Sequence, residues 1–159
     1  ELGKIEDFSS EQAKHLYQTL ALGALKYFLL KVDPKKRMLF NPEDSVDFQG
    51  HTGPFIQYTY VRIRSVMRKA EQLGIQLTQP VVAVPLTGIE QEIIFRLSDF
   101  PEQVAGAARD YSPALISQYA YELAKLYNHL WAEVSVLNEP DADLKYFRIL
   151  LSKPVVDAI

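Results

Sequence analysis

Aromatic and basic side chains share one side of a helix predicted from about residue 54 to residue 74. At about 100° per residue, four of them fall within about 60° of one another on a single stripe. These four are Phe55, Tyr58, Arg62 and Lys69. Aromatic rings give unpaired bases a stacking surface, and cationic groups meet the neighbouring phosphates. The stripe therefore predicts a face that binds single-stranded RNA.

A second interpretation assigns the same residues a purely structural role. Aromatic residues at helical spacing often belong to a core, so Phe55 and Tyr58 could be packing residues and the arginines a solvated face. A different stripe of this helix is suited to burial: Ile56, Tyr60, Ile63, Met67 and Ala70. Between Phe55 and Ala70 there are four basic residues and no acidic one. Periodicity alone leaves both interpretations open.

The rest of the chain also follows the helical period, which predicts an all-α helical bundle with long ordered loops. Ser9 and Ser10 offer caps for a first helix that Asp33-Pro34 stops, with an apolar face of Ala13, Leu16, Tyr17, Leu20, Ala24 and Phe28. Further helices are expected at about 88–110, 112–137 and 140–159. Loops are expected at 35–53, with a possible extended run at 38–40, and at 75–87.

Prolines mark the expected interruptions of these helices. The region 88–110 should break at Phe100-Pro101, and Ser112-Pro113 supplies a cap and a first-turn proline for the next helix. Pro154 should kink or divide the last helix. Because residues 155–159 are apolar-rich and carry no Gly or Pro stop signal, we expect the chain to continue beyond Ile159 and its final helix to fray.

Composition limits the class of protein. The chain has 159 residues, of which 48% are apolar and 23% charged, as in ordinary globular domains. It has no cysteine, no apolar run near the roughly 18 residues of a membrane span, and no signal pattern, so we expect a cytoplasmic protein without a membrane partner. The net charge of −3 means that any RNA binding must depend on local charge. A first residue other than Met predicts a fragment or a processed chain.

One continuous string before and within the second helix is unusually specific. The residues from Asp47 to Tyr58 read DFQGHTGPFIQY, and VRIRS follows from Val61 to Ser65. This string closely resembles the F-x-G-N-T-G-P-Y-x-Q-Y signature of class I arginyl-tRNA synthetases, which leads into the helical anticodon-binding domain of the DALR type. Downstream, Tyr121-Glu122-Leu123-Ala124 and Tyr127-Asn128 resemble the family's Y-E-L-A-x-x-F-N helix.

Three positions depart from the family pattern. His51 stands in place of Asn, Phe55 in place of Tyr, and Trp131 in place of Tyr. The exchange at position 55 keeps a stacking ring and removes a phenol that could donate a hydrogen bond, and the exchange at position 131 keeps an aromatic face.

The resemblance implies a role for each matching residue. Phe55, Tyr58, Arg62 and Lys69 would line the face that receives the anticodon loop of tRNA(Arg). Either Tyr127 or Trp131 would stand opposite. Gly53 and Pro54 would form the turn that orients the second helix. Residues 1–52 would connect this domain to a catalytic domain of the same protein, and residues 53–159 would form the helical anticodon-binding core.

The resemblance also implies a parent enzyme, an arginine–tRNA ligase that uses ATP with magnesium. The chain itself contains neither of the family's two nucleotide-binding motifs (H-I-G-H-like and K-M-S-K-S-like) and no phosphate-binding glycine loop. Its three histidines have no metal-ligand spacing, so we expect no catalytic residue, cofactor or metal within it.

Two other classes of function compete with this interpretation. A helical protein-interaction module would bind through an apolar face, and its affinity would depend little on salt. A self-contained hydrolase or transferase would need a cluster of catalytic groups, which the sequence does not contain.

The missing motifs yield a first prediction. The chain by itself should catalyse neither arginine-dependent ATP–pyrophosphate exchange nor aminoacylation of tRNA. Radiolabel exchange with purified protein measures this directly. Robust exchange that survives a control for contaminating host synthetase would contradict the prediction.

Overall fold

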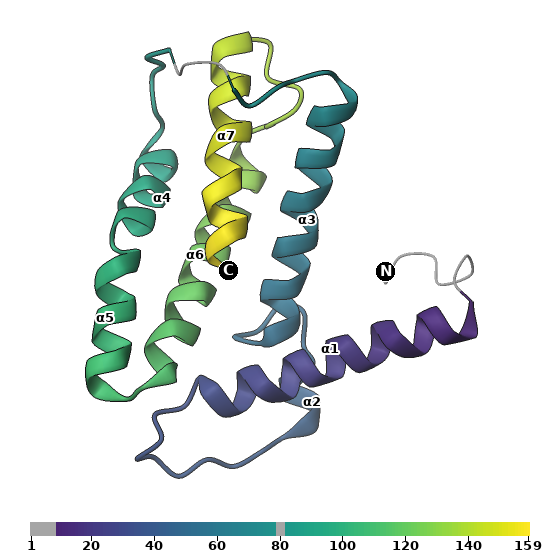
Figure 1. The fold of residues 1–159 in the computed structure, drawn as a ribbon, viewed down its shortest axis with the longest axis vertical. Coiled ribbons are helices and arrows are strands. Elements are labelled where there is room, and N and C mark those ends of the chain that lie inside the picture. The colour runs from purple at the N-terminus through teal and green to yellow at the C-terminus, as the bar shows by residue number, and fades with distance from the viewer. Residues whose placement is uncertain (1–8, 79–81) are drawn as a thin grey trace.

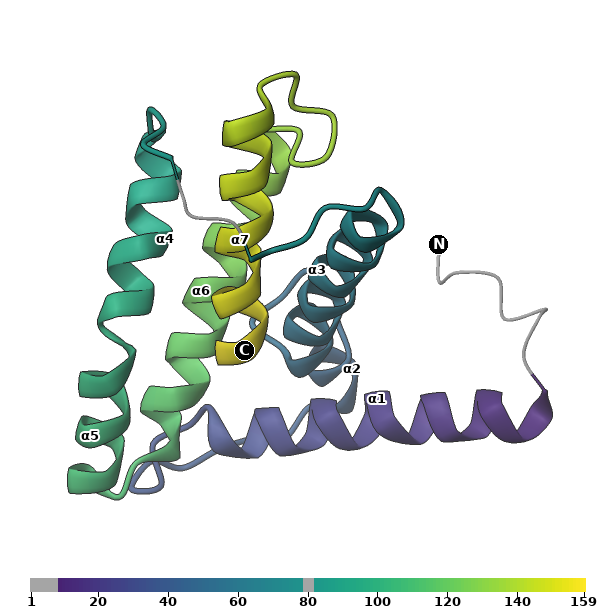
Figure 2. The ribbon, with the colours of Figure 1, turned by 45° about the horizontal axis from the view of Figure 1, so that its top comes forward.

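The computed structural model describes residues 9–78 and 82–159, and all regular elements in these ranges are helices. The helices are α1 (Ser10–Leu30), α2 (Pro42–Ser45), α3 (Gly53–Gln72), α4 (Gly88–Ser98), α5 (Phe100–Asp110), α6 (Pro113–Glu133) and α7 (Ala142–Ala158). Helices α3, α6 and α7 stand side by side with the α4–α5 pair, and α1 crosses one end of this bundle (Figures 1 and 2). The predicted all-α bundle is confirmed. No described helix has the length and apolar character of a membrane span.

Local capping signals explain where most helices begin. The Ser9 hydroxyl accepts from the Gln12 amide in a capping box, and Thr87 forms the same motif with Glu90. Thr52 caps α3 by accepting from the Phe55 amide. Ser112 lies at the predicted cap position of α6, but its hydroxyl makes no capping bond, so α6 begins on Pro113 without one.

Several predicted boundaries shift in the structure. The break between α4 and α5 falls at Asp99, beside the predicted Phe100-Pro101. Helix α6 ends at Glu133 rather than near residue 137, because the backbone turns extended at Val134 and Val136 becomes a buried core residue. Residues 38–40 form no strand, and the loop that contains them carries the short helix α2 instead. The predicted crossing at 75–87 is non-helical where it is described, and residues 79–81 lie outside the described ranges.

The C-terminal helix differs most from expectation. Pro154 does not divide α7, which continues to Ala158. Proline lacks an amide hydrogen and so removes one helical hydrogen bond, but Val155 and Val156 on the next turn are buried. Ala158 and Ile159 also pack against the main core. This burial opposes the predicted fraying, because separating the last turn would expose apolar surface.

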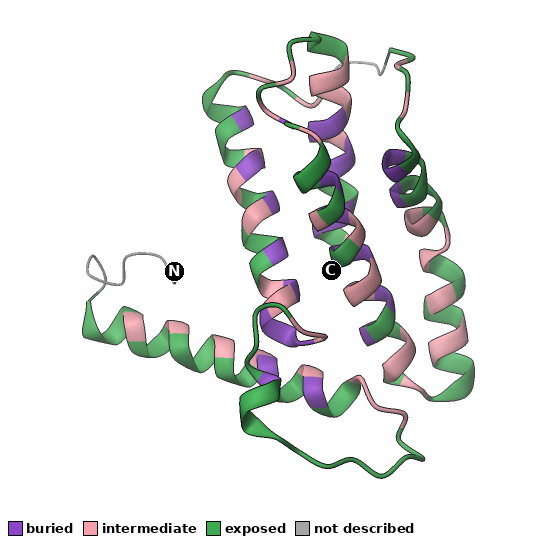
Figure 3. Ribbon diagram, turned by 180° about the vertical axis from the view of Figure 1, so that it is seen from behind, coloured by how far each residue is buried: buried purple, intermediate pink, exposed green. Residues whose placement is uncertain are grey.

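The centre of the bundle holds the main hydrophobic core. Its buried members are Ile63, Ile89, Ile93, Tyr119, Leu123, Tyr127, Leu130, Leu151, Val155 and Val156. A second cluster joins Val66 and Ala70 of α3 to Val136 and Ile149. In Figure 3 the buried residues of α3 form a line that faces the other helices.

The buried stripe of α3 is close to the predicted one, with one error. Ile56, Ile63 and Ala70 are buried and Met67 is partly buried, as predicted, whereas Tyr60 is 44% exposed. Thr59 is buried at the adjacent position instead. One residue corresponds to about 100° around a helix, so this single step moves a side chain from the core to the surface.

The buried residues of helix α1 both lie in its second half. Ala24 and Phe28 are buried, but Tyr17 from the same predicted face is 52% exposed. The first half of α1 extends beyond the other helices (Figure 2), and none of its residues is fully buried. Amphipathic periodicity cannot indicate where a helix leaves its neighbours.

A close backbone contact sets α1 against the start of α3. A Cβ atom on Gly53 would lie 2.7 Å from the Gly23 carbonyl oxygen, a distance that real side chains essentially never show. Gly53 and Pro54 are both buried at this crossing. The predicted structural role of these two residues at the start of the helix is consistent with this contact, and only glycine at position 53 allows it.

Two glycine-to-alanine changes should therefore have opposite effects. Gly53→Ala should lower the free energy of unfolding by about 1–3 kcal/mol, since the new methyl group overlaps a backbone carbonyl. Gly106→Ala, within α5, should raise it by about 0.5–1 kcal/mol, because its Cβ would meet only a Leu115 methyl at an ordinary 3.9 Å. Urea unfolding of both variants measures the difference. Equal effects at the two positions would contradict the tight crossing.

Candidate RNA-binding face

Four of the predicted site residues line one groove between α3 and α6. Tyr58, Arg62 and Lys69 contribute from α3, and Trp131 contributes from α6 across a space of about 310 Å³. Tyr58 is 51% exposed and Trp131 39% exposed, so both rings are accessible. The stripe predicted for α3 thus lies on an open surface over this part of its length.

The Arg62 guanidinium lies between the two exposed aromatic rings. Its central carbon is 4.9 Å from the centroid of the Tyr58 ring and 5.3 Å from the centroid of the Trp131 ring. Its Nη2 also donates to the Tyr58 hydroxyl over 3.4 Å. These cation–π contacts hold a positive charge beside two flat apolar surfaces, which is the combination that an unpaired nucleotide needs.

Asn128 is a member of this site that the sequence did not single out. Its Oδ1 accepts a hydrogen bond from Arg62 Nη1, and its Nδ2 donates to the Thr59 hydroxyl over 2.7 Å. Asn128 is part of the Tyr127-Asn128 pair in the family motif, but the motif assigns it no role. Because Lys125 and His129 beside it are polar too, no local pattern in α6 distinguished Asn128.

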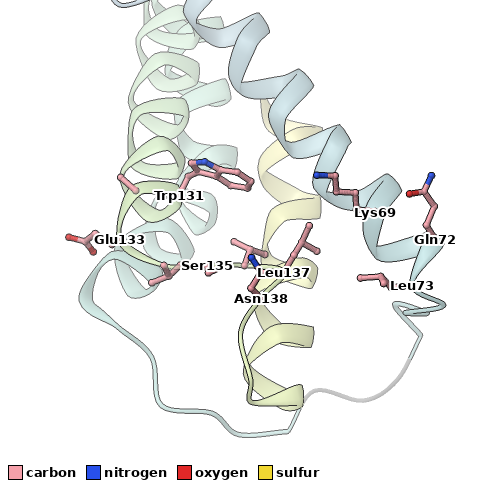
Figure 4. Close-up of a pocket in the computed structure, with 11 residues that line it drawn as sticks. Lys69, Gln72, Leu73, Trp131, Glu133, Ser135, Leu137 and Asn138 are labelled. Carbon is pink, nitrogen blue, oxygen red and sulfur yellow. The ribbon is translucent and has the colours of Figure 1, made fainter. Parts of the chain in front are cut away.

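A larger groove of about 660 Å³ adjoins the first and shares three of its residues, Lys69, Trp131 and Leu137. Figure 4 shows Trp131 reaching from α6 toward α3, with Lys69 on the opposite wall and Leu137 and Asn138 at the base. Polar and apolar side chains both line this groove, and they include the indole ring of Trp131. A planar polar ring is the kind of ligand that fits such a lining.

Tyr127 does not belong to this face, contrary to one of the two alternatives. Its side chain is completely buried, and its hydroxyl shares a 2.9 Å hydrogen bond with the Ser152 hydroxyl of α7. Burial raises the pKa of this phenol, although the Ser152 hydrogen bond partly offsets that effect. Tyr127 is a core residue, and Trp131 is the aromatic residue that stands opposite α3.

Phe55 lies apart from the two grooves, in an aromatic cluster beside the start of α3. Its ring packs 5.3 Å from that of Tyr121, and the His51 ring lies 3.9 Å from the same tyrosine. Phe55 is only partly exposed. Burial, together with the nearby Lys31 ammonium, lowers the pKa of His51 and favours a neutral ring. The predicted stripe is therefore split, because Phe55 packs within the aromatic cluster and the other three residues line the groove.

Together these features suit an all-α domain that binds through an aromatic and cationic groove. Within residues 9–78 and 82–159 no group of three or more metal-ligating side chains comes together. The polar side chains of the groove hold one another and the two rings in place, and they form no nucleophile–base pair of the kind that catalysis requires.

Comparison with known proteins identifies the family. Residues 56–159 match the family described as "DALR anticodon binding domain". The chain belongs to this family.

Its relatives carry a consistent name. The chain is 52% identical over its whole length to the arginine–tRNA ligase of Flavobacterium psychrophilum and 50% identical to that of Amoebophilus asiaticus. It spans 26% and 27% of their lengths, about a quarter of each. The arginyl-tRNA synthetase of Thermus thermophilus superposes with a TM-score of 0.80 at 27% identity, over 98% of this chain and 26% of that one. The synthetase of Plasmodium falciparum, at 21% identity and a TM-score of 0.76, shares the fold.

The different environments of the two α6 aromatics predict different mutational effects. Tyr127→Ala should lower the free energy of unfolding by about 3–5 kcal/mol, since it removes a large, fully buried ring. Trp131→Ala should cost well under half of that amount, because its ring is partly exposed and faces a groove. Thermal unfolding of both variants tests the assignment, and a larger loss for Trp131→Ala would contradict it.

Proposed function

We propose that this chain binds the anticodon loop of tRNA(Arg) as part of an arginine–tRNA ligase. Binding would place the tRNA so that its acceptor end reaches an active site elsewhere in the parent protein. There arginine would be attached with ATP and magnesium. The observation that carries this proposal is the groove in which Arg62 lies between Tyr58 and Trp131.

The chemistry of the groove supports RNA in preference to other ligands. The exposed faces of Tyr58 and Trp131 can stack on unpaired bases, and Lys69 on the rim can meet a phosphate. Arg64 and Arg68 are exposed on the same helix and add to the local positive potential. The charge along this helix is therefore positive, although the net charge of the whole chain is −3.

Phe55 has a more indirect role in this proposal. Its ring is packed against Tyr121 and only partly exposed, so it can stack on a base with one face at most. We assign it to the edge of the RNA face, where it also supports the start of α3. Loss of its ring should lower stability as well as affinity.

The first 52 residues support a second part of the proposal, a contact with the catalytic domain of the same protein. Large apolar side chains remain exposed along α1: Tyr17, Leu22, Leu25, Leu29 and Leu30. The relatives are about four times longer than this chain, so most of their polypeptide is available to cover such a surface.

The same apolar surface is the observation that favours the alternative function, a helical protein-interaction module without RNA binding. The two functions differ in their dependence on salt. Binding of RNA releases counterions and weakens steeply as salt rises, whereas apolar docking through α1 does not. Titration with an RNA stem-loop that carries the anticodon-arm sequence of an arginine-accepting tRNA, at several salt concentrations, separates them.

Alanine substitutions in the groove should weaken this binding without unfolding the protein. Tyr58→Ala and Trp131→Ala should each cost about 1–3 kcal/mol of affinity for the stem-loop, the usual magnitude for base–aromatic stacking. Tyr60→Ala is the matched control, since Tyr60 is a similarly exposed tyrosine of α3 outside the groove. Variants of Tyr58 and Trp131 that stay folded and bind like Tyr60→Ala would refute the placement of the RNA face.

Arg62→Ala should reveal which part of the nucleotide this side chain meets. If Arg62 contacts a phosphate, the slope of log affinity against log salt should fall by roughly 0.7, as expected for one contact on a single strand. If it contacts a base edge, the slope should stay nearly constant and discrimination between loop sequences should relax. Unchanged affinity in a folded Arg62→Ala variant would exclude both roles.

A further inference from the structure

The contacts around Arg62 form a chain of hydrogen bonds in which every donor points the same way. Arg62 Nη1 donates to Asn128 Oδ1, and Asn128 Nδ2 donates to the Thr59 hydroxyl over 2.7 Å. The Thr59 hydroxyl in turn donates to the Phe55 carbonyl over 2.9 Å. This series of hydrogen bonds thus links the Arg62 guanidinium to the Phe55 carbonyl of the same helix by way of Asn128 on α6.

The direction of these hydrogen bonds explains why an amide is needed at position 128. A guanidinium can only donate, so its partner must accept. The Thr59 hydroxyl donates its hydrogen to the Phe55 carbonyl, so its oxygen can only accept a hydrogen bond from residue 128. Asparagine accepts at one end and donates at the other, which satisfies both neighbours at once. Alanine would satisfy neither of them, and a carboxylate would satisfy only Arg62 unless Thr59 turned its hydrogen.

Burial makes this arrangement rigid. Thr59 is completely buried and Asn128 is half-buried, so neither can exchange its partner freely for water. A free arginine side chain has rotamer entropy to lose when it binds a ligand. Because Asn128 already holds the guanidinium between Tyr58 and Trp131, much of this entropy is lost before any ligand arrives.

From this geometry we infer that Asn128 is a positioning residue for RNA binding, which acts by holding Arg62 between the two rings in the free protein. The inference rests on the proposed function and deepens it. It assigns part of the affinity for the RNA loop to a residue that need not touch the RNA.

Five variants and a control test this inference, with melting temperature, affinity for the anticodon-arm stem-loop and its salt dependence measured on each. Asn128→Ala should weaken binding by about threefold to tenfold, because Arg62 then has to lose more of its rotamer entropy when it binds the loop. The salt slope should stay at the wild-type value, because Arg62 keeps its charge. Gln118→Ala, an exposed amide of the same helix outside the grooves, should change neither quantity.

A double substitution distinguishes positioning from an independent contact. If Asn128 acts through Arg62, the Asn128→Ala/Arg62→Ala variant should bind no more weakly than Arg62→Ala alone. Losses that multiply instead would show that Asn128 acts separately, and would overturn the inference.

The Thr59 pair gives a test that remains valid if Asn128→Ala does not fold. Thr59→Val keeps the volume and removes the hydroxyl, so Asn128 loses its anchor and RNA affinity should fall severalfold. Thr59→Ser keeps the hydroxyl and loses only a methyl group, so it should lower the melting temperature and leave affinity near the wild-type value. Equal affinities for these two variants would overturn the inference.

The fluorescence of Trp131 reports on Arg62 without any RNA, because Trp131 is the only tryptophan. Arg62→Ala and Asn128→Ala should change its emission in the same direction, whereas Gln118→Ala should leave it unchanged. An emission change in Arg62→Ala alone would show that the guanidinium stays in place without Asn128. If wild-type protein does not bind the stem-loop, the proposed function fails. If it binds and only Asn128→Ala behaves like wild type, the positioning role alone fails.

Discussion

The burial of one side of α3 is the constraint on which the candidate site depends. Ile56, Thr59, Ile63, Val66 and Ala70 recur every three or four residues and are all buried. Once these residues face the core, the geometry of the helix fixes the directions of its other side chains. Tyr58 and Lys69 must be exposed, and Arg62 must lie at the border where α6 meets α3. The position of the proposed RNA-binding face therefore follows from the packing of the opposite face.

Polar contacts between helices then determine the register of the bundle. Asn128 joins α6 to α3 through Thr59 and Arg62 at the edge of the groove. Deeper in the structure, the Arg148 side chain of α7 donates to Glu90 at the start of α4 over 2.7 Å, and both groups are nearly inaccessible. Burial alone would raise the pKa of Glu90, but its hydrogen bonds from Arg148 and Thr87 outweigh this effect and lower it. A buried pair of this kind specifies one arrangement, since Glu90 without Arg148 would be an uncompensated buried charge.

The two types of contact serve different purposes in this domain. Apolar packing of α3, α6 and α7 supplies most of the stabilisation, and it tolerates small shifts along a helix. Directional bonds at Asn128 and Glu90 tolerate such shifts poorly, because a displacement of about an ångström breaks them. A domain that presents a side chain to a ligand from the seam between two helices needs both properties, since the position of Arg62 depends on α3 and α6 together.

Local sequence determined much of the structure by itself. The helices of the bundle, the cap at Ser9 and the break near Phe100 all depend on side chains and backbone within a few residues, so they could be predicted. The string around Gly53 likewise identified the family, and it predicted Tyr58 and Arg62 as candidates for RNA binding. These are short-range properties.

Only the tertiary structure decided between Tyr127 and Trp131. The two residues are four positions apart on α6, which places them only about 40° apart around the helix, so no periodicity can tell them apart. Their difference lies in height along α6: Tyr127 meets Ser152 of α7 within the core, whereas Trp131 lies one turn higher beside the open groove. The role of Asn128 was hidden for the same reason, because its partners Thr59 and Arg62 are more than 60 residues away in sequence and become neighbours only when α3 packs on α6.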